Sequence, residues 1–259
     1  MRKWLWFLAV ILFLGFAWLV VFEPTVLGHV KDGVRLYIES IPITGNADER
    51  KATYSLAWGF TPLKAEIQDL KIQGPRGEWD NIMFFEPVLS AKFIKLDPKK
   101  LMINIKPEVM EIGHVDFEGK VHYLTLLKML ANAYPNFHPH DFEFVKGNVV
   151  RLTGVLQEVQ SEVTFIGEFQ VNADGELEYK IDRIANFLQE EIIDARARDK
   201  VLRTFQPKWH FQIMGLDLKV DRAAVSELDV YIKAESPGKK FETPQAVVIK
   251  TPDEKDKGK

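Results

Sequence analysis

Apolar and polar residues alternate along much of the chain, most regularly between residues 159 and 181. Odd-numbered positions from Val159 to Val171 are apolar or small, while the positions between them are mostly polar. This period of two predicts a strand with one buried face. Asp174-Gly175 then marks a turn, because both residue types tolerate positive φ, and the alternation resumes at Leu177. We therefore expect a β-hairpin in this region.

The same alternation predicts strands over most of the rest of the chain. A second hairpin is expected from Trp209 to Val220 with a returning strand over 228–234, and further strands at 64–73, 88–96, 101–106, 112–121 and 143–154. In the first of these, the apolar positions change parity at Gln68-Asp69. A β-bulge there would restore the facing of the side chains. Such a bulge predicts a strongly curved sheet.

Two segments follow a helical period instead. From Tyr123 to Tyr134 the apolar residues recur at three- and four-residue spacing, and Pro135 follows. From Asp182 to Phe205 one face is apolar and the other charged, and Pro207 marks the end. This order of elements predicts an α+β fold, a long, strongly curved antiparallel sheet wrapped around one or two helices, because a sheet with one apolar face must cover it.

The N-terminal region has a different composition. Residues 4–22 contain no charged side chain, and at about 1.5 Å per residue nineteen residues nearly span a hydrocarbon core. Arg2 and Lys3 precede this segment, so the positive-inside rule predicts a single transmembrane helix with a cytoplasmic N-terminus. Its expected anchor residues at the membrane are Trp4, Trp6, Trp18 and Phe22. A cleaved signal peptide is the alternative, although no small-x-small cleavage site follows.

Three regions are therefore expected. Residues 1–22 form the membrane anchor, residues 23–235 form an α+β domain outside the cytoplasm, in the periplasm or at the cell surface, and residues 236–259 form a flexible charged tail. The whole chain has a formal charge of −3, and without Arg2 and Lys3 the remainder carries 32 basic and 37 acidic side chains. This balance provides no general attraction for nucleic acid.

Motifs for catalysis are missing. The chain has no cysteine, which excludes thiol nucleophiles, Cys-ligated zinc and iron–sulfur clusters. It has no P-loop, dinucleotide-binding, zinc-protease or serine-hydrolase motif, although a carboxylate pair for glycoside cleavage stays open. Two polar clusters, His138-Pro139-His140 with Asp141, and His114 with Asp116 and Glu118, are interpreted as solvated. We expect no metal, no cofactor and no enzymatic activity.

Aromatic residues make up 12% of the chain. A curved sheet around a helix leaves either a packed core or an elongated apolar groove for acyl chains, and the sequence does not separate the two. The candidate groove residues are Leu127, Val163, Phe165, Phe169, Tyr179, Phe187, Leu188 and Ile192.

A family resemblance agrees with the second alternative, an elongated apolar groove. It is carried by residues 65–74 (AEIQDLKIQG), 112–121 (IGHVDFEGKV) leading into the helix at 123–134, 148–154 (NVVRLTG), the 163–181 hairpin, the 184–206 helix and 215–220 (GLDLKV). Over roughly residues 50–235 the chain resembles the LmeA-like phospholipid-binding family, whose fold is related to the tubular lipid-binding (TULIP) domains. The Pro-rich stretch 135–139 and the uncleaved anchor depart from many members of the family.

The resemblance implies an apolar groove for lipid and no catalytic chemistry. We therefore expect a membrane-anchored protein that binds phospholipid or another acylated molecule, in lipid transfer or envelope maintenance. Its partners would be the bilayer and an acyl-chain ligand, with an envelope protein partner left open. The alternative is an anchored structural or assembly module without a ligand.

Overall fold

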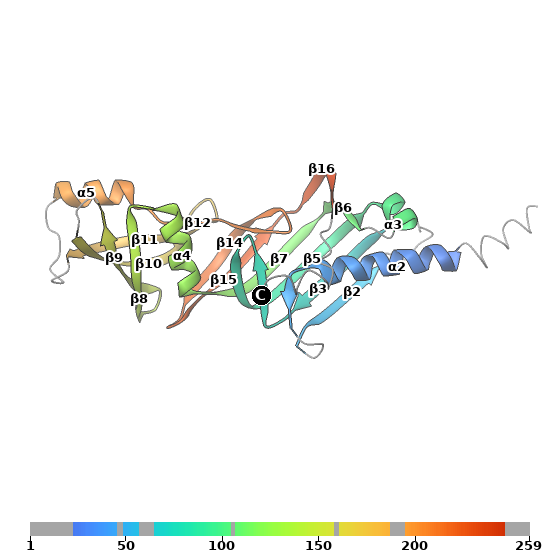
Figure 1. The fold of residues 1–259 in the computed structure, drawn as a ribbon, viewed down its shortest axis with the longest axis horizontal. Helices are drawn as coiled ribbons and strands as arrows, with labels where there is room; N and C mark the ends of the chain where they lie inside the picture. The colour runs from blue at the N-terminus through green and yellow to red at the C-terminus, as the bar shows by residue number, and fades with distance from the viewer. Residues whose placement is uncertain are drawn as a thin grey trace, which may run out of the picture.

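The computed structural model describes residues 23–45, 49–56, 65–104, 107–157, 161–186 and 195–246. In these residues antiparallel strands dominate and four helices accompany them (Figure 1). The molecule is elongated, with an eleven-stranded sheet toward one end and a five-stranded sheet toward the other. A sheet-dominated α+β fold is therefore confirmed, with two sheets in place of the single long one that we expected.

The elements have the following bounds. The helices are α2 (Glu23–Ser40), α3 (Pro98–Asn104), α4 (Tyr123–Ala133) and α5 (Ala195–Thr204). The large sheet contains β1 (Ile43–Thr44), β2 (Lys51–Leu56), β3 (Glu66–Gln73), β4 (Arg76–Trp79), β5 (Ile82–Leu96), β6 (Glu108–Ile112), β7 (His114–His122), β13 (Phe211–Ile213), β14 (Leu216–Val225), β15 (Asp229–Ser236) and β16 (Lys239–Ala246). The small sheet contains β8 (Phe137–Lys146), β9 (Val149–Leu156), β10 (Ser161–Val171), β11 (Leu177–Asn186) and β12 (Lys208–Trp209).

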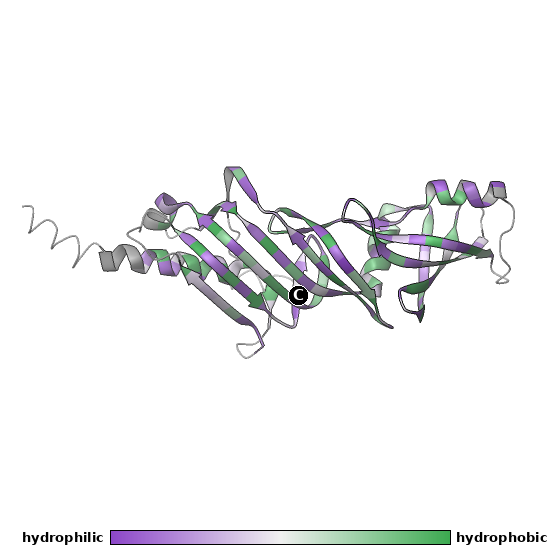
Figure 2. Ribbon diagram, turned by 180° about the vertical axis from the view of Figure 1, so that it is seen from behind, coloured by the Kyte–Doolittle hydropathy of each residue, from purple (hydrophilic) through white to green (hydrophobic). Residues whose placement is uncertain are grey.

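The large sheet is organised around β5, a strand of 15 residues. Its first residues pair with β4 and its later residues with β3, while β7 runs along its other side. The change of partner coincides with a register shift after Phe85 and with a positive φ of 49° at Glu86. From β7 the sheet continues through β15 and β14 to β13. Alternating hydropathy along these strands shows one apolar and one polar face (Figure 2).

The predicted bulge in β3 is confirmed. Leu56 of β2 pairs with Ile67 and the adjacent Ser55 pairs with Asp69, so Gln68 is an extra residue relative to β2. Ile67 and Leu70 are consequently both buried although three positions separate them. The extra residue restores the facing of the apolar side chains, as the change of parity required.

Helix α3 corrects one prediction, because residues 101–104 are helical and not part of a strand. Asp97 precedes the helix, and its Oδ1 accepts hydrogen bonds from the backbone N–H groups of Lys99 at 2.8 Å and Lys100 at 3.3 Å. Pro98 occupies the first helical position, where its missing N–H costs nothing. Leu101 packs directly over Gly33 of α2, at a point where a Cβ on Gly33 would collide with the leucine side chain.

The small sheet is a meander with the strand order β12-β11-β10-β9-β8. The predicted hairpin of β10 and β11 is confirmed, and so is the helix beginning at Tyr123. The predicted strand 143–154 is wrong as one element, because Gly147 turns the chain between β8 and β9 with a φ of 62°. The second predicted helix starts later than expected. Residues 182–186 belong to β11, where Ile184 pairs with Phe165 and is buried.

Buried residues of both sheets form one continuous core. The connection runs through β12 and β13. Trp209 lies 5.3 Å from Phe169 of the small sheet, ring centre to ring centre, and Phe211 lies 6.0 Å from Phe84 of the large sheet. Backbone contacts support the junction, since the N–H of Val220 donates to the carbonyl of Gly175 at 2.6 Å.

The two terminal predictions have different outcomes. The flexible tail is wrong for residues 239–246, which form β16 and pair with β6 from Lys239 opposite Ile112 to Ala246 opposite Glu108. This pairing satisfies backbone groups that β6 would otherwise leave free. The predicted anchor, with Trp4, Trp6, Trp18 and Phe22, lies outside the described residues. Of the described helices, none combines the length and apolarity needed to cross a bilayer.

Candidate functional site

An open cleft of about 310 Å³ lies in the small-sheet half of the molecule, where β11 and β12 meet the chain that leaves α5. It is lined by Glu178, Tyr179, Lys180, Ile181, Leu202, Phe205, Gln206, Pro207 and Lys208. The buried side chains Tyr179, Phe205 and Pro207 form its floor, and the exposed Lys180 and Lys208 lie at its rim. The cleft therefore combines an apolar base with charged groups at its mouth.

Phe205 holds the floor in place. Its ring stacks on Phe165 at a centroid distance of 4.5 Å and meets the edges of Phe137 at 4.7 Å and Tyr134 at 4.9 Å. The Tyr134 hydroxyl also donates a 2.6 Å hydrogen bond to the carbonyl of Gln206. These contacts attach the chain after α5 to the core of the small sheet.

Tyr179 contributes both to the floor and to the core behind it. Its hydroxyl donates toward the carbonyl oxygens of Val150 at 2.8 Å and Phe165 at 2.9 Å. Burial raises the pKa of this phenol well above its ordinary value, because the phenolate would be desolvated. The residue therefore acts as a neutral donor and fixes the spacing of β9, β10 and β11.

The rim of the cleft carries more positive than negative groups. Glu178 accepts a 2.6 Å hydrogen bond from the side chain of Gln170, which holds it against β10. Lys208 is only loosely associated with Glu176, with 3.9 Å between Nζ and Oε2. Together with Lys180 this lysine offers ammonium groups to an anion at the mouth of the cleft. The arrangement suits an amphiphile whose apolar part enters first.

The predicted groove residues that the structure describes come together, but in a packed core. Leu127, Val163, Phe165, Phe169 and Tyr179 are all buried. The space beside three of them, between α4 and the small sheet, is about 10 Å³. That volume holds at most one water molecule, whereas ligand pockets measure about 300–1,000 Å³. Of this set, Tyr179 reaches the open cleft.

Other parts of the prediction lie elsewhere. Phe187, Leu188 and Ile192 lie outside the described residues. Leu202, Phe205 and Pro207 line the cleft but were not predicted as site residues. Pro207 could have indicated these residues from the sequence. A proline that ends an amphipathic helix places the last apolar residues of that helix beside the strand that follows.

The two histidine clusters also have defined positions. His138 contacts the side-chain amide of Gln157 at 2.8 Å, and Asp141 accepts a 2.9 Å hydrogen bond from the N–H of Phe142. His138, His140 and Asp141 do not converge on one point, so they form no three-ligand group. His114, Asp116 and Glu118 lie on the outer face of β7, opposite buried Val115 and Phe117, as expected, and the three are half-buried.

Comparison with known proteins adds no relative. No protein-family model matches the chain, and searches of curated proteins and of solved structures find no match either. The resemblance to the LmeA-like family therefore stays an expectation from the sequence, and the site has to be interpreted from its own geometry.

Proposed function

We propose that this chain is a membrane-anchored protein outside the cytoplasm that binds an acyl chain of a phospholipid or another acylated molecule. The observation that carries the proposal is the cleft beside α5, with Phe205 and Tyr179 at its floor and Lys180 and Lys208 at its rim. Burial of each CH₂ group on such a floor contributes about 0.8 kcal/mol. The ammonium groups would hold an anionic headgroup at the mouth.

The volume of the cleft limits the ligand. About 310 Å³ is near the lower end of the range for small-molecule sites. It therefore fits part of one acyl chain better than a whole two-chain lipid. A larger ligand would require α5 to separate from the sheet, and the Phe205 stack and the Tyr134 hydrogen bond are the contacts that such a motion would break.

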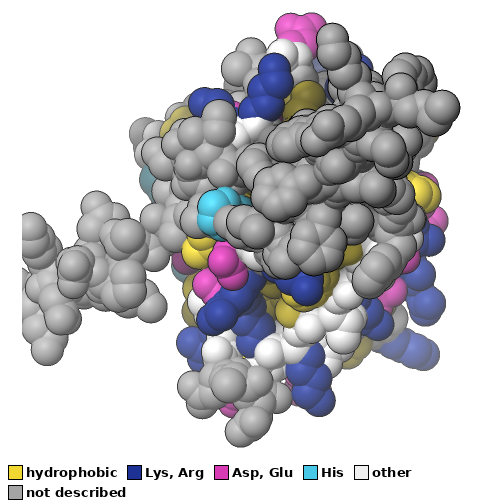
Figure 3. All heavy atoms as spheres, turned by 90° about the vertical axis from the view of Figure 1, so that its right-hand side faces the viewer, with side chains coloured by type: hydrophobic (Ala, Val, Ile, Leu, Met, Phe, Trp, Pro, Cys, Tyr) yellow, Lys and Arg dark blue, Asp and Glu magenta, His cyan; other side chains and the backbone are white. Residues whose placement is uncertain are grey.

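The shape of the molecule suggests where the ligand is handled. Helix α2 begins at Glu23, directly after the predicted membrane segment, and lies toward the opposite end of the molecule from α5 (Figure 1). Lysine and arginine side chains are prominent on the described surface of the α2 end (Figure 3). They suit an anionic bilayer surface. The cleft would then take up or present its ligand away from the membrane that holds the anchor.

The finer expectation of a TULIP-like sheet wrapped around a helix is part of this proposal. Helix α4 supports it, because Leu126, Leu127 and Leu130 are buried and line the same small space as Phe142 and Phe169 of the small sheet. In this reading α4 fills most of the interior of the small sheet, and the cleft beside α5 is the part that remains open.

Extraction and mass spectrometry of the purified protein test the proposal. We expect a co-purified or exchangeable acylated molecule whose amount falls severalfold in Leu202→Trp, because the indole fills the cleft. The matched control is Leu124→Trp on α4, where the leucine is 57% exposed and lies away from the cleft lining. Equal retention by both variants would place the ligand elsewhere.

A second candidate function is a structural or assembly module without a ligand. It is favoured by the 10 Å³ space between α4 and the small sheet, which shows a filled core where a groove was expected. This alternative predicts that the wild-type protein yields no lipid after extraction and takes up no labelled fatty acid from vesicles. Both results together would replace the lipid-binding proposal.

A further inference from the structure

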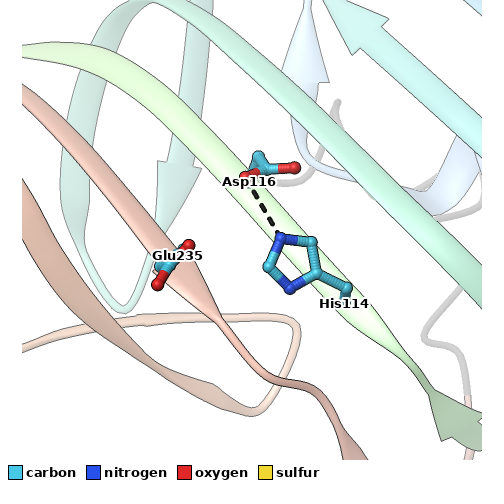
Figure 4. Close-up of side chains that lie close together, drawn as sticks. All are labelled: His114, Asp116 and Glu235. Carbon is cyan, nitrogen blue, oxygen red and sulfur yellow. Dashed lines mark hydrogen bonds and ion pairs between the residues drawn. The ribbon is translucent and has the colours of Figure 1, made fainter.

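The outer face of the large sheet brings together three side chains that can bind a metal. Strands β7 and β15 pair so that Asp116 lies directly opposite Glu235, and His114 is two residues away on the same face of β7 (Figure 4). One nitrogen or oxygen atom from each side chain lies within 4.8 Å of the others. The His114 ring nitrogen Nε2 is already 3.2 Å from Oδ1 of Asp116.

The charges around this group are unbalanced. Like charges directly opposite each other on paired strands are destabilising, and Asp116 and Glu235 form such a pair. The neighbouring carboxylate on β7 is neutralised by the residue opposite it, since Glu118 lies opposite Lys233 and forms an ion pair with it at 3.5 Å. Among the described residues, no lysine or arginine forms a comparable ion pair with Glu235 or Asp116.

The lysines that could neutralise Asp116 and Glu235 lie on the strands that flank β7 and β15. Lys219 of β14 lies opposite Glu235, and Lys92 of β5 lies opposite His114. Neither forms an ion pair within 4.0 Å, and both are exposed. The two carboxylates therefore lie close together with only the imidazole of His114 beside them (Figure 4), an arrangement that a bound cation would stabilise.

We propose that His114, Asp116 and Glu235 bind a divalent transition-metal ion of the Zn²⁺ class. Zn²⁺ prefers four ligands, accepts imidazole nitrogen at about 2.0–2.1 Å and carboxylate oxygen at about 2.0–2.2 Å, and so needs ligand atoms about 3.4 Å apart. The imidazole favours this class over Ca²⁺ and Mg²⁺, which take six or more oxygen ligands.

Two properties of the site follow from its place in the fold. Its donors project from two neighbouring strands, which hold side chains more rigidly than loops do. Because Glu235 is exposed, the fourth coordination position would face solvent and be filled by water. The ion would also join residues far apart in the chain, so binding should raise the unfolding temperature.

Calorimetric titration of the metal-free full-length protein with Zn²⁺ tests the proposal, and Co²⁺ absorption reports the coordination geometry. We expect one site whose affinity falls at least about tenfold in His114→Ala and in Glu235→Gln. The matched control is His210→Ala, because His210 contacts Asp217 at 3.0 Å but belongs to no three-ligand group. This variant should bind Zn²⁺ as the wild type does.

Two further variants separate metal binding from a structural role. Glu235→Gln should raise the unfolding temperature of the metal-free protein, since it removes the carboxylate repulsion, and yet abolish the rise that Zn²⁺ produces. Lys219→Gln should strengthen Zn²⁺ binding because it removes a competing positive charge. Wild-type affinity no higher than that of His114→Ala, or an equal loss in His210→Ala, would overturn the proposal.

Discussion

Replacing Phe205 with alanine tests whether the end of the small sheet is packed or hollow. The side chain is 3% exposed and contacts three aromatic rings at centroid distances of 4.5–4.9 Å. Phe→Ala substitutions in packed cores cost about 3–5 kcal/mol, and aromatic pairs add to the lost burial. We therefore expect a loss of about 4 kcal/mol, or about 8–16 °C in the unfolding temperature for a chain of this size.

The assay is urea unfolding followed by circular dichroism, with Phe93→Ala as the matched control. Phe93 is 53% exposed, and the same substitution there should cost less than about 1 kcal/mol. A difference of less than about 1 kcal/mol between the two variants would refute the packed arrangement. It would mean that Phe205 lies in an open groove or that the chain after α5 is not attached to the sheet.

Three more predictions concern the small sheet. Thr164→Val should lower the free energy of unfolding by about 1–3 kcal/mol, because the buried hydroxyl of Thr153, which lies 3.1 Å from that of Thr164, then has no partner. The double variant, with valine at both positions, should lose less stability in the same urea assay. Gly167→Ala should cost about 1–3 kcal/mol in thermal unfolding, because the added Cβ would collide with the carbonyl of Lys180. Finally, the raised pKa of Tyr179 means that its phenol ionises first in the unfolded chain, so the contribution of this residue to stability should be lost as the pH rises above about 10, and the fall in stability there should be less steep in Tyr179→Phe.

Elements set by neighbouring residues could be predicted from the sequence. The hairpin around Asp174-Gly175 has its turn and its apolar face within a few residues, and the bulge at Gln68 follows from a local change of parity. Helix α3 could also have been predicted, because Asp97 is an N-cap residue and Pro98 occupies the first helical position. The apolar run that begins at Leu101 concealed that signal and suggested a strand.

Partners distant in sequence could not be predicted. Alternation shows that Asp116 and Glu235 each lie on the polar face of a strand, but not that they lie opposite each other. The length of β11 could not be predicted for the same reason, because residues 184–186 pair with residues 163–165 of β10. The cleft likewise depends on where the chain after α5 meets β11, where the backbone N–H of Tyr179 donates a 3.0 Å hydrogen bond to the carbonyl of Pro207.

The position of β15 and β16 at the end of the chain has a consequence for how the protein is made. The small sheet is a meander, so each of its strands after β8 pairs with the strand that precedes it in the chain. In contrast, β7 and β6 emerge before residue 123, and their partners β15 and β16 begin only at residues 229 and 239. Until then both strands have an unpaired edge, which favours association with other chains. Premature termination before residue 229 should therefore give an aggregating product rather than a smaller folded one.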